Sequence, residues 1–428
     1  MSNRTPSPIR LLVADELPYS HGVENVSVAL VMEFLELMEG VTWVTTKPSR
    51  AHELKKRLSN ARNLNFASLF PAESATQTND KLSTSLNWKG MVKRLPFIGR
   101  EARKAYRKKI DDRLKQISQE NRCTHCFVNY ALSQTAPKVE IPVVGLIHDL
   151  NFLHYPDNFA RNAPGELRLA IANWLQDADA VTVLSEAGKD ELLSLVDGPP
   201  NAHVEIIPNA IKTMKKENFR RQGKGPPIFL YPATALAHKN HLGLLQAARE
   251  LALNGNHFQV MMTGSRIEEI GKREPLANAT VEKARCYYAE NEHILSKVVA
   301  FRSARDSNEL SQLYREAHRV ILPTRYEGFG LPLLEALSHG IRVTCSRIPQ
   351  FLEQVTRYEL TDWVDFFDAE SSKSIAKAME RSLLQKEDPL PFEEVEEKLT
   401  KWQWRDSALA YLNLFANMQL NESPRGHH

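Results

Sequence analysis

Tyr326-Glu-Gly-Phe-Gly-Leu-Pro-Leu-Leu-Glu335 is the stretch of this chain that says most about its fold and its chemistry. Residues 319–323, Arg-Val-Ile-Leu-Pro, come shortly before it and predict a short buried strand, and Pro332 suits the first turn of a helix. Between the two, Gly328 and Gly330 allow a tight turn with exposed backbone N–H groups. We therefore expect a strand, a glycine turn and a helix whose N-terminus favours an anion such as a phosphate.

Two glutamates flank this turn, Glu327 before it and Glu335 on the expected helix. A glutamate, seven residues and a second glutamate form the signature of the retaining, nucleotide-sugar-dependent glycosyltransferases of family four, which this stretch resembles. Residues 335–346 also resemble the helix, glycine turn and strand that follow the signature. The alternative is an ordinary strand-turn-helix unit with surface carboxylates. The resemblance implies an α/β protein of the GT-B type, with two Rossmann-like, doubly wound domains that face each other across a cleft.

Length and composition agree with two domains. The chain has 428 residues, of which 42% are hydrophobic and 25% charged, as in a soluble globular protein. It has no run of about 18 apolar residues to cross a bilayer, and residues 1–8 lack the apolar core of a signal peptide. Four cysteines are too few for a disulfide framework. We therefore expect a cytoplasmic protein.

The first half of the chain alternates strand and helix patterns, which is typical of a parallel sheet. A helix is expected at residues 26–38 and a mobile loop at residues 66–90. Strands are expected at residues 9–14, 41–45, 126–128, 143–147 and 180–184. These elements predict a first, acceptor-binding domain at residues 1–208.

A polar, basic stretch at residues 212–227 ends in glycines and prolines and is the best linker candidate. Beyond it, a nucleotide-sugar donor domain is expected at residues 226–400, with strands at residues 228–231, 260–263 and 298–301 and helices at residues 241–253 and 310–317. The amphipathic residues 406–418 predict a last helix. The resemblance implies that this helix, within residues 404–420, crosses back to the first domain.

A lysine follows the opening strand of the second domain, where a helix is expected to begin. Lys239 is therefore well placed to meet a diphosphate. Similar proteins often carry an arginine about five residues earlier, where this chain has Thr234. Lys239, together with His238, would then balance the phosphate charge. The alternative for Lys239 is a surface lysine at the start of a helix.

His148 and Asp149 follow an expected strand of the first domain, at the edge where open α/β sheets bind ligands. In the family that the chain resembles, a histidine at this place contacts the hydroxyls of the donor sugar, and Asp149 would then be structural. Residues 18–25 resemble the family's glycine-rich loop beside the diphosphate. Only Gly22 matches, because His21 stands in place of the other glycine.

The positive charge of the chain is concentrated in one segment. Residues 89–115 hold eleven Lys or Arg against three acidic residues, interleaved with apolar residues such as Met91 and Phe97. The segment is either a solvated basic helix or one that lies on an anionic membrane surface, which would place the protein on the inner face of the membrane. Nucleic acid is a weaker alternative, because no recognised binding motif accompanies the charge.

Two sequence patterns resemble metal-binding motifs, but their context does not support a metal site. Asp177-Ala-Asp179 has the spacing of a metal-binding pair but precedes an expected strand, so a helix end explains it. Cys123-Thr-His-Cys126 has no second pair at the spacing of a zinc site. We expect neither a metal nor another cofactor.

Together these features predict a retaining, metal-independent hexosyltransferase. The resemblance assigns Lys239 to the donor diphosphate, Glu335 to the ribose, and Glu327 and His148 to the transferred sugar. The backbone amides of the turn would contact the donor at Gly328, Phe329, Gly330 and Leu331. The string at residues 238–241 is similar to that of bacterial transferases that build surface polysaccharides, often on lipid-linked intermediates. The donor would be GDP-mannose or a UDP-sugar, and the acceptor a glycan or lipid-linked glycan.

Three other functions stay open on these residues. Because the second glycine and the arginine are missing, the chain could be a catalytically weak paralogue that binds a sugar nucleotide or scaffolds a partner enzyme. Glu327 could act as a nucleophile, although two-carboxylate hydrolases need side chains about 5 Å apart across the bond. A sugar-nucleotide isomerase of the same architecture is the third alternative.

Overall fold

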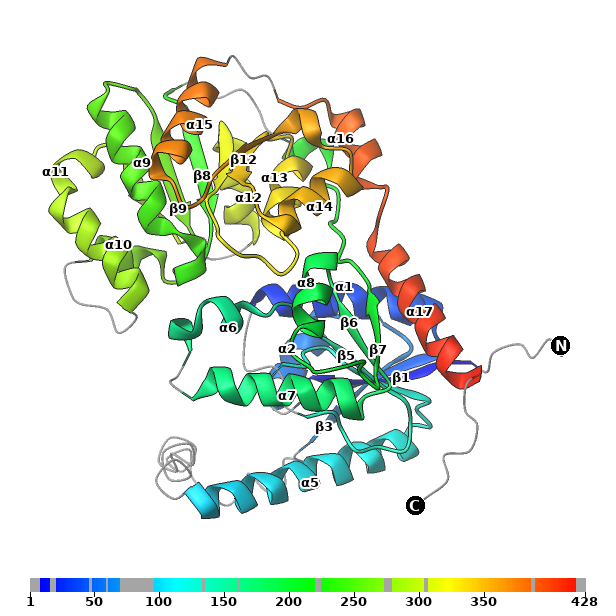
Figure 1. Cartoon of the computed structure of the whole chain (residues 1–428). Coiled ribbons are helices and arrows are strands. Elements are labelled where there is room, and N and C mark those ends of the chain that lie inside the picture. Colours follow the sequence, from blue (N-terminus) through cyan, green and yellow to red (C-terminus); the bar gives the residue numbers. More distant parts are fainter. Residues whose placement is uncertain are drawn as a thin grey trace.

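The computed structural model consists of two lobes, each built around one parallel sheet, and Figure 1 shows one lobe above the other. The last helix runs down from the upper lobe along the side of the lower one. The structure describes residues 8–15, 21–45, 48–58, 61–69, 96–132, 135–159, 162–219, 225–272, 279–303, 307–385 and 389–420.

The lower lobe contains seven parallel strands in the order β3-β2-β1-β4-β5-β6-β7. The strands are β1 (Arg10–Asp15), β2 (Gly40–Thr45), β3 (Leu64–Ser68), β4 (His125–Val128), β5 (Val143–Leu146), β6 (Ala180–Val183) and β7 (His203–Ile206). The helices are α1 (His21–Leu37), α2 (Pro48–Arg57), α5 (Pro96–Glu120), α6 (Asn151–His154), α7 (Ala163–Asp177) and α8 (Glu186–Leu193). Strand order reverses between β1 and β4, which opens a crevice at the carboxyl ends of these strands.

The upper lobe contains six parallel strands in the order β10-β9-β8-β11-β12-β13. The strands are β8 (Ile228–Pro232), β9 (Gln259–Thr263), β10 (Val299–Phe301), β11 (Arg319–Leu322), β12 (Val343–Ser346) and β13 (Val364–Phe367). The helices are α9 (His241–Leu253), α10 (Ala279–Glu290), α11 (Glu292–Leu295), α12 (Ser307–Glu316), α13 (Leu331–Ser338), α14 (Pro349–Arg357), α15 (Ser372–Leu384) and α16 (Phe392–Leu399). Here the order reverses between β8 and β11, the two strands that precede Lys239 and Glu327.

The predicted fold class is confirmed, and each expected strand is present to within a residue or two. The prediction of a loop from residue 66 onward was wrong at its start. Residues 64–68 form β3, because they pair with β2 at the edge of the sheet. Residues 70–90 lie outside the described part of the chain. Strands β7 and β13 had no clear sequence pattern, and α1 begins five residues earlier than expected.

The last helix, α17 (Trp404–Leu420), packs on the lower lobe (Figure 1). The rings of Tyr411 and Phe415 lie 5.8 and 6.4 Å from that of Phe34 on α1. The Tyr411 hydroxyl lies 2.9 Å from Thr182 Oγ1, and His125 Nε2 lies 3.0 Å from the Phe415 carbonyl oxygen. The C-terminal residues of the chain therefore complete the core of the first lobe.

Acidification should destabilise this contact through His125. Burial lowers the pKa of His125 to about 4, whereas an unfolded histidine titrates near 6.5. Between these values the unfolded chain binds a proton that the folded chain does not, so the free energy of unfolding falls as the pH drops. The slope from this one group is at most about 1.4 kcal/mol per pH unit.

Urea unfolding of the wild type and of His125→Asn at pH 7 and pH 5 tests this. The variant should lose less stability on acidification than the wild type. His203→Asn is the control, because the His203 side chain is 64% exposed. An equal loss in the wild type and in His125→Asn would contradict the assignment.

The basic segment is helical from residue 96 onward as α5, and residues 89–95 lie outside the described part of the chain. Ile110, Leu114 and Ile117 of α5 are buried against the lower lobe. Lys104, Lys108 and Lys109 are exposed. In the described residues, no helix is both long enough and apolar enough to span a membrane. Binding to a membrane surface stays a prediction.

Candidate active site

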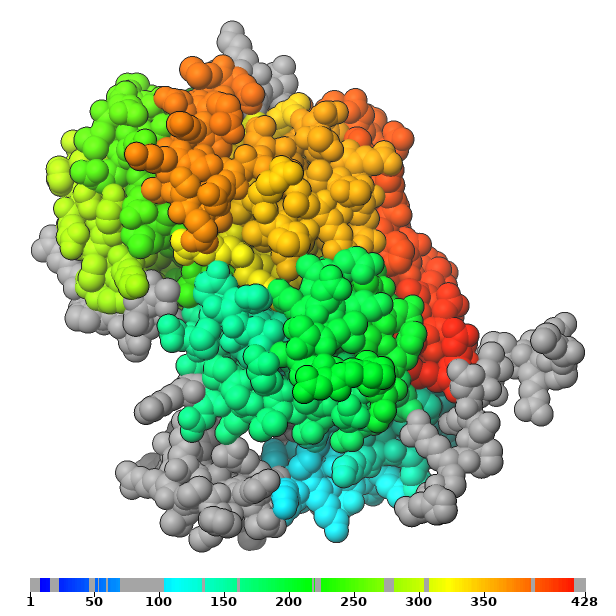
Figure 2. All heavy atoms as spheres, in the orientation of Figure 1, coloured from blue at the N-terminus to red at the C-terminus, as the bar shows by residue number. Residues whose placement is uncertain are grey.

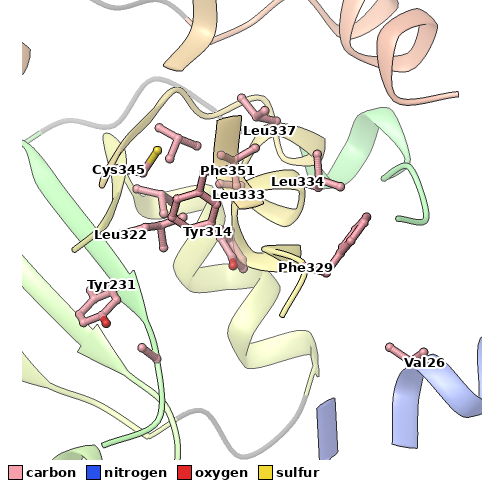
Figure 3. Packing of buried hydrophobic residues seen from close by; sticks show 14 of the residues in the cluster. Val26, Tyr231, Tyr314, Leu322, Phe329, Leu333, Leu334, Leu337, Cys345 and Phe351 are labelled. Atoms are coloured by element: carbon pink, nitrogen blue, oxygen red, sulfur yellow. The ribbon is translucent and has the colours of Figure 1, made fainter. Parts of the chain in front are cut away.

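The turn at residues 323–330 connects β11 to α13 as the sequence predicts. Gly330 is the N-cap of α13 with φ +95°, a left-handed conformation that favours glycine, and Pro332 lies in the first turn. A Cβ at Gly330 would lie 2.9 Å from the Phe351 ring. Figure 3 shows Phe351 within the apolar cluster, near Leu333, and Phe329 at the margin of that cluster. The apolar core thus fixes the turn from below.

Lys239 and Glu327 meet at this turn. Lys239 Nζ lies 2.6 Å from Glu327 Oε1, and the two side chains are only 15% and 12% exposed. Lys239 ends the 3-10 turn Ala237–Lys239, and the Tyr231 hydroxyl of β8 donates a hydrogen bond to its carbonyl oxygen. The ammonium group therefore lies where two strand ends converge, and Glu327 neutralises it in the absence of another anion.

Hydrogen bonds connect the turn at residues 323–330 to the loop that contains Lys239. The N–H of Arg325 donates to the His238 carbonyl oxygen at 2.7 Å, and the Thr324 hydroxyl lies 3.2 Å from the same oxygen. After Lys239, Asn240 has φ +55° and caps α9, because its side chain accepts a hydrogen bond from the Gly243 N–H at 3.2 Å. Little backbone freedom is left around the ion pair.

Glu335 lies one turn into α13, partly buried beneath the same site. The Tyr314 hydroxyl of α12 donates to Glu335 Oε2 at 3.3 Å. Burial raises the pKa of the Glu335 carboxyl group, and the negative charge of Glu327 adds to this effect. Glu327 therefore influences the ionisation of Glu335 across the turn, and a bound ligand that donates hydrogen bonds would favour the ionised form of Glu335.

His148 follows β5 at the carboxyl edge of the first sheet, as predicted. Its Nε2 lies 2.8 Å from the Asn129 carbonyl oxygen, and burial lowers its pKa to about 4. The ring is therefore neutral at pH 7. Because Nε2 faces a carbonyl oxygen, this nitrogen carries the proton, which makes Nδ1 the acceptor for a ligand hydroxyl. Asp149 accepts the N–H of Asn151 at 3.1 Å, which supports a structural role at the start of α6.

The two lobes touch where the turn meets this histidine. A Cβ placed on Gly328 would lie 2.0 Å from the His148 carbonyl oxygen and 2.9 Å from Asp149 Cβ. The site residues that the sequence assigns to different domains, His148 and Glu327, thus come from two segments in direct contact. Figure 2 shows the same face from outside, with the yellow and orange atoms of the upper lobe against the green atoms of the lower one.

The structure does not favour a positively charged His238, and contact of this residue with the donor stays a prediction. The ring is buried, and burial together with the charge of Lys239 lowers its pKa to about 3. It lies 5.7 Å from the Tyr155 ring, centroid to centroid. A neutral His238 therefore packs at the lobe contact, and Lys239 alone carries the positive charge in this loop.

The structure describes the other predicted site residues only in part. His21 and Gly22 are the first residues of helix α1 and do not lie in a loop, and residues 18–20 lie outside the described part of the chain. Asp177 ends α7 as expected, and Asp179 Oδ2 accepts the Val143 N–H at 2.8 Å.

The thiols of Cys123 and Cys126 are buried and are not joined in a disulfide. Across the part of the chain that the structure covers, no three His, Cys, Asp or Glu side chains form a group that could hold a metal ion.

Sequence reasoning missed three residues that shape this site, Tyr326, Glu191 and Tyr314. Tyr314 supports Glu335, whereas Tyr326 and Glu191 form a contact between the lobes. Tyr326 directly precedes Glu327 in the sequence, and this position could have indicated a role in the site. Nothing in the local sequence of Glu191 or Tyr314 indicates the partner of either side chain.

Residues 214–398, which include the turn, Lys239 and both glutamates, match the sequence profile of the family described as glycosyl transferases group 1. Over these residues the chain is similar to that family. Curated proteins similar to this chain include O-antigen chain mannosyltransferase B of Escherichia coli, 24% identical over 50% of this chain and 55% of that protein. A second is O-antigen chain mannosyltransferase RfbU of Salmonella typhimurium, 23% identical over 55% of this chain and 60% of that protein. The chain thus spans little more than half the length of these relatives.

Solved structures share the two-lobed fold, which is GT-B. Sucrose-phosphate synthase from Thermosynechococcus elongatus superposes with a TM-score of 0.64 at 16% identity, covering 96% of this chain and 99% of that one. Anabaena HepE in complex with UDP superposes with a TM-score of 0.58 at 13% identity, covering 97% of this chain and 99% of that one. At such identities the likeness establishes the fold and nothing finer.

Proposed function

We propose that this protein is a retaining glycosyltransferase that moves a sugar from a nucleotide-sugar donor to a glycan or lipid-linked glycan in polysaccharide biosynthesis. The observation that carries the proposal is the Lys239–Glu327 pair, 2.6 Å apart at the N-terminal end of α13 and next to the loop of His148. A cation, a helix N-terminus and two carboxylates are the groups that a sugar diphosphate needs.

Each residue has a defined role in this proposal. Lys239 binds the donor diphosphate together with the backbone amides of residues 328–331. Glu335 accepts hydrogen bonds from the ribose, and Glu327 and neutral His148 hold the transferred sugar. The bond from the anomeric carbon to the diphosphate breaks, a bond to the acceptor oxygen forms on the same face, and the acceptor proton goes to the departing diphosphate. Lys239 and the helix dipole stabilise the negative charge that grows on this leaving group.

The names of the relatives support the donor and acceptor classes. Two of them are O-antigen chain mannosyltransferases, which favours GDP-mannose, and the UDP complex of HepE keeps a UDP-sugar as the alternative donor. The acceptor would bind the lower lobe beside His148. A lipid-linked acceptor would also explain the exposed lysines of α5, which could then lie on an anionic membrane surface. No divalent metal is required, because Lys239 supplies the charge.

Release of nucleoside diphosphate from GDP-mannose and common UDP-sugars, with a lipid-linked glycan as acceptor and with EDTA present, tests the proposal. Transfer that produces a glycan with the anomeric configuration of the donor is the expected result. Tight donor binding without any release or transfer would instead support a sugar-nucleotide-binding paralogue, for which Thr234 in place of an arginine is the motivating feature.

Replacing Glu335 with Ala should mostly weaken donor binding. A hydrogen bond to a charged group contributes about 1.5–3 kcal/mol, so the Kd for the donor should rise roughly ten- to hundredfold with a smaller change in kcat. Calorimetric titration with the nucleoside diphosphate measures this. Glu316→Ala, which removes an exposed carboxylate of α12, is the control. An unchanged Kd would refute the ribose assignment.

A further inference from the structure

Helix α8 of the lower lobe lies directly beneath the upper lobe (Figure 1). Two of its residues and its N-cap residue contact the upper lobe. The Ser185 hydroxyl, which caps α8, lies 3.4 Å from the Gly328 carbonyl oxygen, and the Glu186 N–H donates to Glu353 Oε2 of α14 at 3.1 Å. Further along the helix, Glu191 accepts a hydrogen bond from Tyr326. This short helix therefore contacts the glycine turn from two directions.

Tyr326 makes the most specific of these contacts. Its side chain is buried between the lobes, and its hydroxyl donates to Glu191 Oε2 at 2.8 Å. The same hydroxyl accepts the N–H of Leu150 at 3.0 Å, two residues after His148. Burial and the charge of Glu191 raise the pKa of Tyr326, so the hydroxyl keeps its proton and remains a donor. The hydroxyl thus donates one hydrogen bond and accepts another at the lobe contact.

The other side of Glu191 is also occupied. Glu191 Oε1 lies 2.9 Å from His154 Nε2, and the His154 ring lies 5.1 Å from the Tyr326 ring. His154 ends α6, the helix that follows the His148 loop. Glu191 therefore holds both the tyrosine of the upper lobe and a histidine of the lower lobe.

The main chain of Tyr326 is held just as firmly on the donor side. Its carbonyl oxygen accepts a hydrogen bond from the Thr324 hydroxyl at 2.9 Å, and that hydroxyl also contacts the carbonyl oxygen of His238, the neighbour of Lys239. Tyr326 directly precedes Glu327 in the sequence. Tyr326 thus connects two parts of the site. Its backbone is linked to the Lys239 loop and to Glu327, and its hydroxyl contacts the loop that follows His148.

We propose that Tyr326 and Glu191 are positioning residues, whose hydrogen bond sets Glu327 against the His148 loop when the two lobes meet. The inference rests on the proposed function, because it assigns these residues to the geometry of that same site. Neither side chain needs to touch the donor. When the Tyr326–Glu191 hydrogen bond is broken, the upper lobe should therefore still bind the nucleoside diphosphate. The chemical step should become slower.

The kinetic test compares Tyr326→Phe, Glu191→Ala and the double variant with the wild type. Loss of one hydrogen bond to a charged group should lower kcat roughly tenfold, with the Kd for the nucleoside diphosphate changed by less than about twofold. Because both single changes break the Tyr326–Glu191 hydrogen bond, the loss in the double variant should be smaller than the two single losses combined. Tyr358→Phe removes another buried tyrosine hydroxyl contact, 3.3 Å from the Trp402 carbonyl oxygen, and serves as the control. Unchanged kcat in both single variants, or fully additive losses, would overturn the proposal.

A distance measurement tests independently of turnover whether the Tyr326–Glu191 hydrogen bond holds the two lobes together. Spin labels at Leu169 and Leu253, which are 68% and 56% exposed on opposite lobes, report the separation of the lobes in a Cys286→Ser background. We expect a narrow distribution of label-to-label distances in the protein with Tyr326 and Glu191 intact and in Tyr358→Phe. The distribution should be broader in Tyr326→Phe and in Glu191→Ala. Unchanged distributions in both of the latter overturn the proposal, whatever the kinetics. If the wild type transfers no sugar, the proposed function fails, while these distances still decide whether the pair holds the lobes together.

Discussion

Replacing Glu327 with Gln will remove most of the sugar transfer and at the same time strengthen binding of the free nucleoside diphosphate. The loss of transfer should be about 10²–10³-fold in kcat, as for other groups that stabilise developing charge. The gain in binding follows from the ion pair, because Glu327 occupies Lys239 at 2.6 Å and a diphosphate must displace it. Calorimetric titration and steady-state kinetics on the same preparations measure the two effects.

Glu370→Gln is the matched control for this prediction. Glu370 pairs with Arg325 at 2.7 Å beside the same turn, but its side chain is 69% exposed. Exposed pairs of this kind contribute little to stability, so this variant should bind and turn over donor as the wild type does. A Glu327→Gln protein with full activity would refute the catalytic assignment, and unchanged diphosphate affinity would refute the competition for Lys239.

Gly328→Ala should be as damaging as the loss of a catalytic side chain, although it adds only one methyl group. The new Cβ would lie 2.0 Å from the His148 carbonyl oxygen, a backbone atom that cannot rotate away. The lobes would have to separate, and a displacement of about 1 Å can lower turnover about a hundredfold. Activity and small-angle scattering of the variant should show lost turnover and a more open molecule.

Gly165→Ala provides the comparison. Gly165 lies in α7, and a Cβ there meets no other atom within 4 Å. That variant should fold, bind and react as the wild type, so it separates the effect of the lobe contact from that of losing a glycine. Wild-type turnover in Gly328→Ala would show that the lobes do not need this approach.

The fold and the core of the site were predictable because their signals are local. The apolar run, the glycines and Pro332 occur within a few residues, and together they determine β11, the turn and α13. Lys239 follows its strand in the same way. Three strands were not predicted, β3, β7 and β13. All three lie at an edge of the sheets that the described residues form, and β7 and β13 contain charged residues such as Glu205 and Asp365.

The rest of the site depends on contacts between distant parts of the chain. His238 has the sequence context of a charge-bearing loop residue, and its neutrality results from burial at the lobe contact near Tyr155. Tyr326 and Glu191 are 135 residues apart and meet only when both lobes have folded. No local pattern encodes such a pair, because the partner is chosen by the packing of α8 against the upper lobe.

The most direct test of the account is the thermal stability of the whole protein with GDP, UDP and ADP, each with and without magnesium, in the wild type and in Lys239→Ala. A ligand at a hundred times its Kd should add about 2.7 kcal/mol to the free energy of unfolding. We predict that one nucleotide raises the Tm without magnesium and that Lys239→Ala loses most of this shift. No shift with any nucleotide, or an equal shift in Lys239→Ala, would contradict a donor site built around Lys239.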